Sequence, residues 1–193
     1  MISQSDINDK QAAILQAALK LFVELGFHAT PTSKIAKEAG VANGTLFHYY
    51  KTKDELILAL YTDIKTRLSE HMYANVNQND PLEQVFRTIF FNTLEWAQDH
   101  KEEYYFVQQF NLSPFLSLIP QEEILKQARP HLDLIQSGIK NSILKPLAPE
   151  FLYSLINSHI YGLSQYLASA SISAQKQKKL MSDSFEMIWD MIT

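Results

Sequence analysis

The chain has 193 residues, of which 46% are hydrophobic and 20% charged, and its formal net charge is −4. These proportions are typical of a folded protein with a hydrophobic core. The absence of cysteine excludes a disulfide framework, a thiol nucleophile and cysteine-ligated zinc. We find neither a signal-peptide pattern nor a run of about 18 apolar residues. We therefore expect a cytoplasmic protein with no membrane partner.

The charge is unevenly distributed along the chain. Residues 27–53 contain one acid, Glu38, and four lysines, which gives a local charge of +3; the lysines are Lys34, Lys37, Lys51 and Lys53. A basic patch on an acidic protein is an electrostatic feature of nucleic-acid binding. A solvated surface would carry the same charges, so composition alone leaves both interpretations open.

The predicted elements are all helices, and the first two lie before residue 40. Asn8 is predicted to cap the first helix, and Gly26 to end it. The second helix is predicted over residues 31–39, with Thr30 as its cap and Pro31 in its first turn. Gly40 is expected to stop this helix.

Further helices follow to the end of the chain. The third begins near Asn43 and ends near Tyr49, and the pattern of apolar residues predicts others over 51–72, 82–99, 101–112, 121–144, 149–170 and 174–192. Residues 111–120 are expected to form a loop, and Pro130 to kink or split its helix. The sequence therefore predicts an all-α fold of about nine helices.

The second and third helices have the spacing of a helix-turn-helix. About three residues join them, and a connection of that length containing glycine is typical of this motif. Ala36 is small where the helices must cross, Gly40 can adopt the left-handed turn conformation, and Leu46 can fill the space between them. A general corner of two helices is the alternative interpretation.

A helix-turn-helix places the start of its second helix against base edges in the major groove. Asparagine can pair with adenine, and threonine can contact a thymine methyl group. Tyrosine and lysine are common phosphate partners, and the N-terminus of the preceding helix suits a phosphate. Phe47 and Tyr50 are expected in the core. The predicted DNA contacts are Thr30, Thr32, Ser33, Ala42, Asn43, Gly44, Thr45, His48, Tyr49 and Lys53.

The stretch from Ile14 to Tyr61 resembles the DNA-binding domain of the TetR family of bacterial transcriptional regulators. The matching motifs are AALKLFVELGF, T-x-x-x-I-A-x-x-AGV, G-T-L-F-x-Y-Y and K-x-K-x-E-L. The resemblance implies a DNA-binding domain over residues 1–52 and an effector-binding and dimerisation domain over 53–193. It also implies a dimer on palindromic operator DNA, acting as a repressor that a small molecule releases. Phe47 stands where the family usually has tyrosine and cannot donate a hydrogen bond, so that phosphate contact is expected to be absent or replaced by His48.

Nine aromatic residues occur between positions 86 and 116. They fit either a plain hydrophobic core or a pocket for a small organic ligand, and the resemblance favours the pocket. No lysine or arginine is evident as an anchor, so a neutral or cationic aromatic-compatible effector is favoured over a carboxylate. The predicted pocket residues are Phe86, Phe90, Trp96, Tyr105, Gln108, Gln109, Phe110, His131 and Asn157.

The last two predicted helices have apolar stripes and small residues that allow close packing. The resemblance assigns them to a homodimer interface, whose predicted residues are Phe151, Leu155, His159, Gly162, Tyr166, Phe185 and Trp189. The six histidines lack metal-ligand spacing. We therefore expect no catalytic site, metal or cofactor. A helical scaffold or ligand-binding module with a degenerate helix-turn-helix is the remaining alternative.

Overall fold

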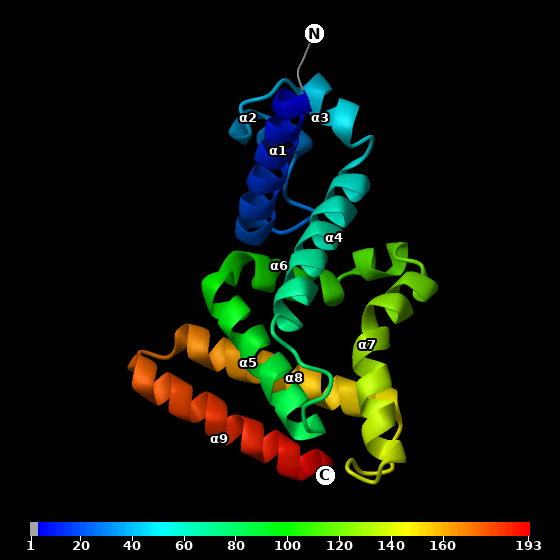
Figure 1. The fold of residues 1–193 in the computed structure, drawn as a ribbon. Coiled ribbons are helices and arrows are strands. Elements are labelled where there is room, and N and C mark those ends of the chain that lie inside the picture. Colours follow the sequence, from blue (N-terminus) through cyan, green and yellow to red (C-terminus); the bar gives the residue numbers. More distant parts are fainter. Residues whose placement is uncertain (1–3) are drawn as a thin grey trace. The chain divides into compact units, whose positions relative to one another are not determined.

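The computed structural model describes the fold of residues 4–193, with side-chain surroundings from residue 9 onward. Over this range the chain forms nine α-helices and one 3₁₀ helix, and no strand, which confirms the all-α prediction (Figure 1). The elements are α1 (Gln4–Leu25), α2 (Thr32–Glu38), α3 (Asn43–Tyr49), α4 (Lys53–Met72), α5 (Leu82–Asp99), α6 (Lys101–Asn111), η1 (Pro114–Leu118), α7 (Gln121–Lys140), α8 (Pro149–Ser169) and α9 (Ala174–Ile192). Among the helices described, none combines the length and apolar character that a membrane crossing requires.

Two predicted helix ends are confirmed and two predicted boundaries are wrong. Gly26 and Gly40 follow α1 and α2 with φ of +79° and +67°, the left-handed region that glycine tolerates best. Helix α1 begins at Gln4, before the predicted cap Asn8. The N-cap of α2 is Pro31, not Thr30, because the Thr30 side chain bonds elsewhere.

The predicted split at Pro130 does not occur, because α7 continues through this residue as one helix. Proline removes only one backbone hydrogen bond, to the carbonyl four residues earlier. That carbonyl belongs to Lys126, an exposed residue, so water can replace the lost donor. The predicted loop over 111–120 is also partly regular, since it contains the 3₁₀ helix η1.

The first of two compact units contains residues 1–67 together with 102–119. It therefore combines α1–α3 and most of α4 with α6 and η1. Aromatic rings join these segments: the ring centres of Phe27 and Phe106 lie 5.5 Å apart, and those of Tyr61 and Phe110 stack at 3.9 Å. Helix α6 thus contributes to the core of the unit that carries the helix-turn-helix.

The second unit contains residues 68–101 and 120–193, and hence α5, α7, α8 and α9. Helices α8 and α9 lie side by side, and α5 packs against both (Figure 1). Its core includes Phe90, Leu94, Ile135, Leu152 and Phe185, all of which are buried. Of these, Phe90, Ile135 and Phe185 also line the cavity described below.

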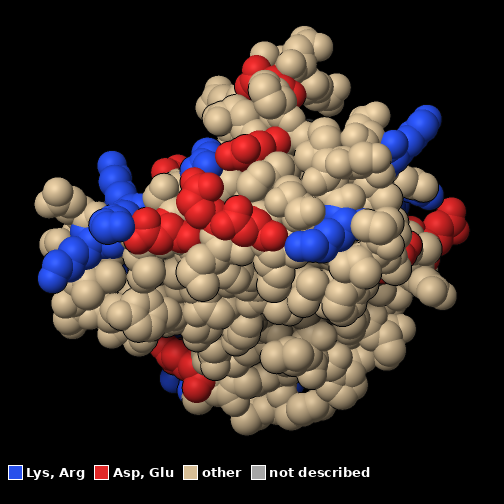
Figure 2. All heavy atoms as spheres, turned by 90° about the horizontal axis from the view of Figure 1, so that it is seen from below, with Lys and Arg blue, Asp and Glu red and all other residues tan. Residues whose placement is uncertain are grey.

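Charged side chains of both signs are mixed on the face shown in Figure 2, where a broad area without charge lies beside a belt of acidic and basic residues. No extended surface of one sign occurs on that face.

Candidate nucleic-acid interface and internal cavity

The turn between α2 and α3 is fixed by a Schellman arrangement. The Val41 N–H donates to the carbonyl of Ala36 at 2.9 Å, and the Gly40 N–H donates to that of Lys37 at 3.2 Å. The left-handed φ of Gly40 makes this pair of bonds possible. Ala36 is buried where the two helices meet, as predicted. The short connection thereby sets the direction in which α3 leaves the turn.

Helix α3 has one buried side and one exposed side. Leu46 is fully buried, and Tyr50, which follows the helix, is also in the core. The exposed side presents Asn43, Gly44 and His48. Phe47 lies on this side too, with 37% of its surface exposed, so the expectation that it packs in the core is wrong. It stands one turn after Asn43, and residues four apart share one face of a helix.

The segment that follows α3 is bonded to the first turn of α4. The Glu55 N–H donates to the Thr52 hydroxyl at 3.0 Å, and the Glu55 carboxylate accepts from the Lys51 N–H at 2.7 Å. This resembles a capping box and orders the first turn of α4. Lys53 occupies that turn and donates to the His28 carbonyl at 3.4 Å. Partial burial lowers the pKa of Lys53.

The remaining predicted contact residues differ in exposure. Thr30 is fully buried, and its hydroxyl lies within 3.1 Å and 2.8 Å of the carbonyls of Leu21 and Gly26. It therefore anchors the end of α1 and is not on the surface. Ser33 and Ala42 are exposed, whereas Thr32, Thr45 and Tyr49 are half-buried.

Glu38, the acid among residues 27–53, forms an ion pair with a lysine of another helix. Glu38 pairs with Lys20 of α1 at 2.6 Å, and this hydrogen bond lowers the pKa of Glu38. Because its charge is offset there, the lysines around α2 and α3 retain a local excess of positive charge. An exposed helix surrounded by positive charge is suited to a DNA groove, whose edges are lined by phosphates.

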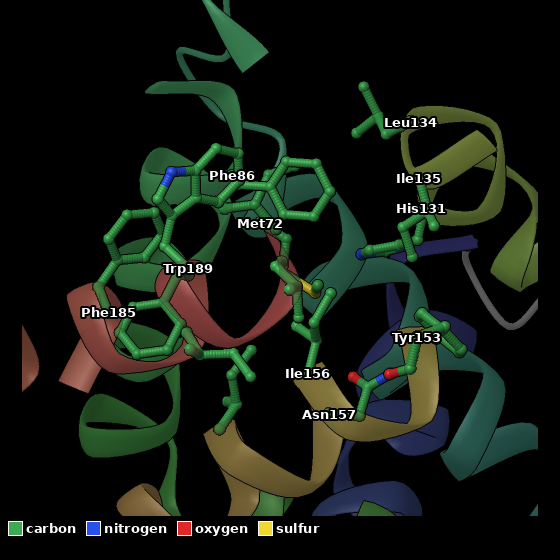
Figure 3. Close-up of a pocket in the computed structure, with 15 residues that line it drawn as sticks. Met72, Phe86, His131, Leu134, Ile135, Tyr153, Ile156, Asn157, Phe185 and Trp189 are labelled. Atoms are coloured by element: carbon green, nitrogen blue, oxygen red, sulfur yellow. The ribbon is translucent and has the colours of Figure 1, made fainter. Parts of the chain in front are cut away.

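The second unit encloses a cavity of about 40 Å³. Its fifteen lining residues come from the end of α4 and from α5, α7, α8 and α9, and none of them is Lys, Arg, Asp or Glu. Figure 3 shows Phe86, Phe185 and Trp189 gathered on one side, with His131, Tyr153 and Asn157 opposite. The cavity is therefore apolar apart from one side.

Four of the nine predicted pocket residues line this cavity: Phe86, Phe90, His131 and Asn157. Trp96 is buried in the same unit but stacks on His100, with ring centres 4.7 Å apart. The other four predicted residues, Tyr105, Gln108, Gln109 and Phe110, lie on α6 in the first unit. Aromatic content alone could not show which of these residues pack in the core of the first unit and which line the cavity of the second unit.

Sequence reasoning missed several polar and flexible lining residues, including Met72 and Tyr153. Tyr153 lies one turn before Asn157 on α8, and this spacing could have indicated it. The ring centre of His131 lies 5.2 Å from that of Tyr73 and 5.4 Å from that of Tyr153. Burial raises the pKa of both tyrosines.

The predicted dimer residues fall into two groups. Phe151 and Tyr166 are 52% and 54% exposed, and Gly162 between them is exposed too. Phe185 and Trp189 instead line the cavity. Leu155 and His159 are half-buried, and the His159 Nε2 atom lies 2.7 Å from the Ser184 hydroxyl oxygen.

Two exposed methionines on α9 were not predicted. Met187 and Met191 are 67% and 46% exposed and stand one turn apart. Together with the exposed Phe151 and Tyr166 of α8, we call these residues the α8–α9 outer face. Large apolar side chains are seldom gathered on a free surface, and such patches are typical of protein interfaces.

Two family models together match most of the chain. The model for bacterial regulatory proteins of the tetR family matches residues 14–60. The model for the tetracyclin repressor-like C-terminal domain matches residues 61–193. The second match alone spans more than half of the chain.

Individual relatives agree with these matches. The chain is 29% identical over 146 residues to YhgD of Bacillus subtilis, an uncharacterised HTH-type transcriptional regulator, which covers 74% of this chain and 75% of that protein. It is 23% identical to KstR2 of Mycobacterium tuberculosis, an HTH-type transcriptional repressor, over 88% of both chains. The crystal structure of a tetR family transcription regulator from Shewanella is similar with a TM-score of 0.87 and 29% identity, covering 95% of this chain and 97% of the other.

Proposed function

The chain belongs to the tetR family of bacterial regulatory proteins, and we propose that it is a ligand-responsive repressor that binds a palindromic operator as a dimer. The observation that carries this proposal is the exposed side of α3, held outward by the Gly40 turn. KstR2, to which this chain is similar, is a transcriptional repressor, and this supports repression over activation. A protein that binds chromosomal DNA would act in the cytoplasm.

In this proposal α3 enters the major groove. Asn43 and Thr45 contact base edges, while Gly44 allows close approach of the helix backbone. Phe47 adds an apolar side chain on the same face, which can contact a thymine methyl group. His48, Tyr49 and Lys53 face the phosphates, together with Thr32 and Ser33 at the start of α2. Thr30 has a structural role only.

A palindromic operator requires two copies of α3 related by a two-fold axis. We propose that the α8–α9 outer face forms the dimer interface, with Gly162 allowing the helices to approach closely. Phe185 and Trp189 are left out of this interface because they line the cavity.

The cavity is the proposed effector site. An effector changes DNA affinity only through its different affinities for the DNA-binding and non-binding states of the dimer. Because the cavity is enclosed by helices of the second unit, a ligand there can alter their packing. Release of DNA by such a ligand would make the protein a sensor of that molecule.

The proposal is tested by selecting genomic fragments that bind the purified protein and measuring their affinity by fluorescence anisotropy. We expect a recurring inverted repeat whose affinity falls steeply with salt, since phosphate contacts release counterions. A protein that binds no fragment more tightly than random DNA would refute the function.

A further inference from the structure

The cavity of the second unit is suited to a molecule with two unlike ends. Its aromatic side, with Phe86, Phe185 and Trp189, offers only apolar surface. The opposite side carries its polar groups, from His131, Tyr153 and Asn157 (Figure 3). Few polar groups in an apolar site fix the orientation of a ligand. A bound molecule would therefore place an apolar body against the rings and a polar group opposite.

The lining offers no permanent charge to balance an ionised ligand, since it contains no Lys, Arg, Asp or Glu. The Arg87 guanidinium lies 4.3 Å from the centre of the Phe185 ring, on a residue that lines the cavity. Two carboxylates already hold it, those of Glu83 at 3.1 Å and Glu186 at 2.6 Å. A carboxylate ligand would lose its hydration without gaining a permanent counter-charge. This environment disfavours free acids.

A hydroxyl next to the polar side is ready to donate. Within the described part of the chain, the buried Tyr73 hydroxyl makes no hydrogen bond. Its ring adjoins His131, which in turn adjoins Tyr153. Burial raises the pKa of both phenols, so both remain neutral and protonated at physiological pH. A buried hydroxyl without a partner destabilises a protein unless a bound molecule accepts from it.

On the basis of the function proposed above, we propose that the effector is an uncharged apolar molecule with one oxygen that accepts a hydrogen bond, such as a hydroxyl or carbonyl oxygen. This oxygen lies among Tyr73, His131 and Tyr153. The cavity of about 40 Å³ holds about three waters. Met72 lines the cavity, and we infer that its flexible side chain adjusts to admit a larger molecule.

The test compares octanol, octanone and octanoate, which share a chain length and differ in the polar group. Binding at neutral pH is followed by titration calorimetry and by intrinsic tryptophan fluorescence, since Trp189 lines the cavity. We expect octanol and octanone to bind and octanoate to bind about tenfold more weakly or not at all. Octanoate binding as tightly as octanol, or no binding by either neutral probe, would overturn the inference.

Conservative variants test the assigned position of the oxygen. Tyr73→Phe and Tyr153→Phe each remove one hydroxyl and are expected to weaken octanol binding about fivefold. Tyr161→Phe is the matched control, since this tyrosine lies on α8 but does not line the cavity. Unchanged octanol affinity in both the Tyr73→Phe and the Tyr153→Phe variant would refute the placement.

The DNA measurements keep this inference separate from the proposed function. A protein that binds its operator fragments yet prefers octanoate would refute the ligand class alone. A protein that binds octanol in preference to octanoate but binds no DNA selectively would refute the regulatory function alone.

Discussion

Arg67 holds Glu103 with two parallel hydrogen bonds, of 2.8 Å and 3.0 Å, and so ties α4 to α6 within the first unit. Arg67 also reaches Asp63, one turn earlier on α4. Both acids raise the pKa of Arg67, with Glu103 the larger cause. The pair fixes α6 on the helix that begins beside the predicted DNA-binding helix.

We predict that Glu103→Gln lowers the free energy of unfolding by about 1 kcal/mol, because a partly buried bidentate pair contributes more than an exposed one. Urea denaturation measures the change. Asp183→Asn is the matched control, since Asp183 pairs with Lys179 at an exposed site. Equal effects of the two substitutions would contradict a special role for the Arg67–Glu103 pair.

Two glycines of the helix-turn-helix are predicted to respond oppositely to alanine. Gly40→Ala is expected to cost about 1–2 kcal/mol, because φ at this position is +67° and a Cβ resists it. Gly44→Ala is expected to stabilise α3 by up to about 1 kcal/mol, since its Cβ would meet open space in a helix. Thermal unfolding measures both.

For Gly44→Ala, operator affinity should change in the opposite direction to stability. Gly44→Ala places a methyl group where the helix backbone is proposed to approach the bases, so we expect weaker operator binding from a more stable protein. A Gly44→Ala variant with unchanged operator affinity would contradict the proposed close approach.

The local chemistry of the sequence predicted the helix-turn-helix well. Gly26 and Gly40 mark helix ends because left-handed backbone conformations favour glycine. Local spacing also predicted the buried positions of Ala36 and Leu46. Hydrophobicity alone favours a core position for Phe47, whereas its place on the exposed side of α3 leaves it 37% exposed. Periodicity along the helix was the better guide.

The position of α6 could not be predicted from sequence. Its buried rings, Phe106 and Phe110, meet Phe27 and Tyr61 through contacts between distant parts of the chain. No local pattern distinguishes such a contact from one with the following helices. The same limit applies to Phe185, whose apolar stripe is compatible with a dimer interface and with the cavity wall.

Tyr73→Phe is predicted to leave stability at neutral pH unchanged or slightly higher, because the hydroxyl makes no hydrogen bond among the described residues. The pKa of Tyr73 is raised by burial, so the folded protein keeps this proton above pH 10.0 while the unfolded chain releases it. Stability is therefore constant below that pH and falls as the pH rises above it. Tyr73→Phe should reduce this alkaline loss in a series of urea titrations. Tyr161→Phe serves as control, and an equal reduction there would contradict the assignment.

The α8–α9 outer face is predicted to hold the dimer together. Met187→Glu introduces a charge at a side chain that is 67% exposed in the single chain, so folding should be unaffected while association is lost. Analytical ultracentrifugation measures the mass. Gln175→Glu adds the same charge at an exposed site near the start of α9 and should leave the dimer intact. A monomeric parent protein, or a dimeric Met187→Glu variant, would contradict this interface.

The DNA contacts are predicted to divide into two kinds. Asn43→Ala should lose discrimination at one or two base pairs, by about 1–3 kcal/mol, because base edges are read by direct hydrogen bonds. Lys53→Ala should weaken binding to all sequences alike and reduce the slope of log affinity against log salt by about 1, because a phosphate contact carries no sequence information. Lys179→Ala, on α9, removes a lysine outside the interface and is the control. Anisotropy titrations against operator variants at several salt concentrations separate these effects. If Asn43→Ala and Lys53→Ala changed the salt slope and the base preference in the same way, α3 would not be the element that distinguishes one sequence from another.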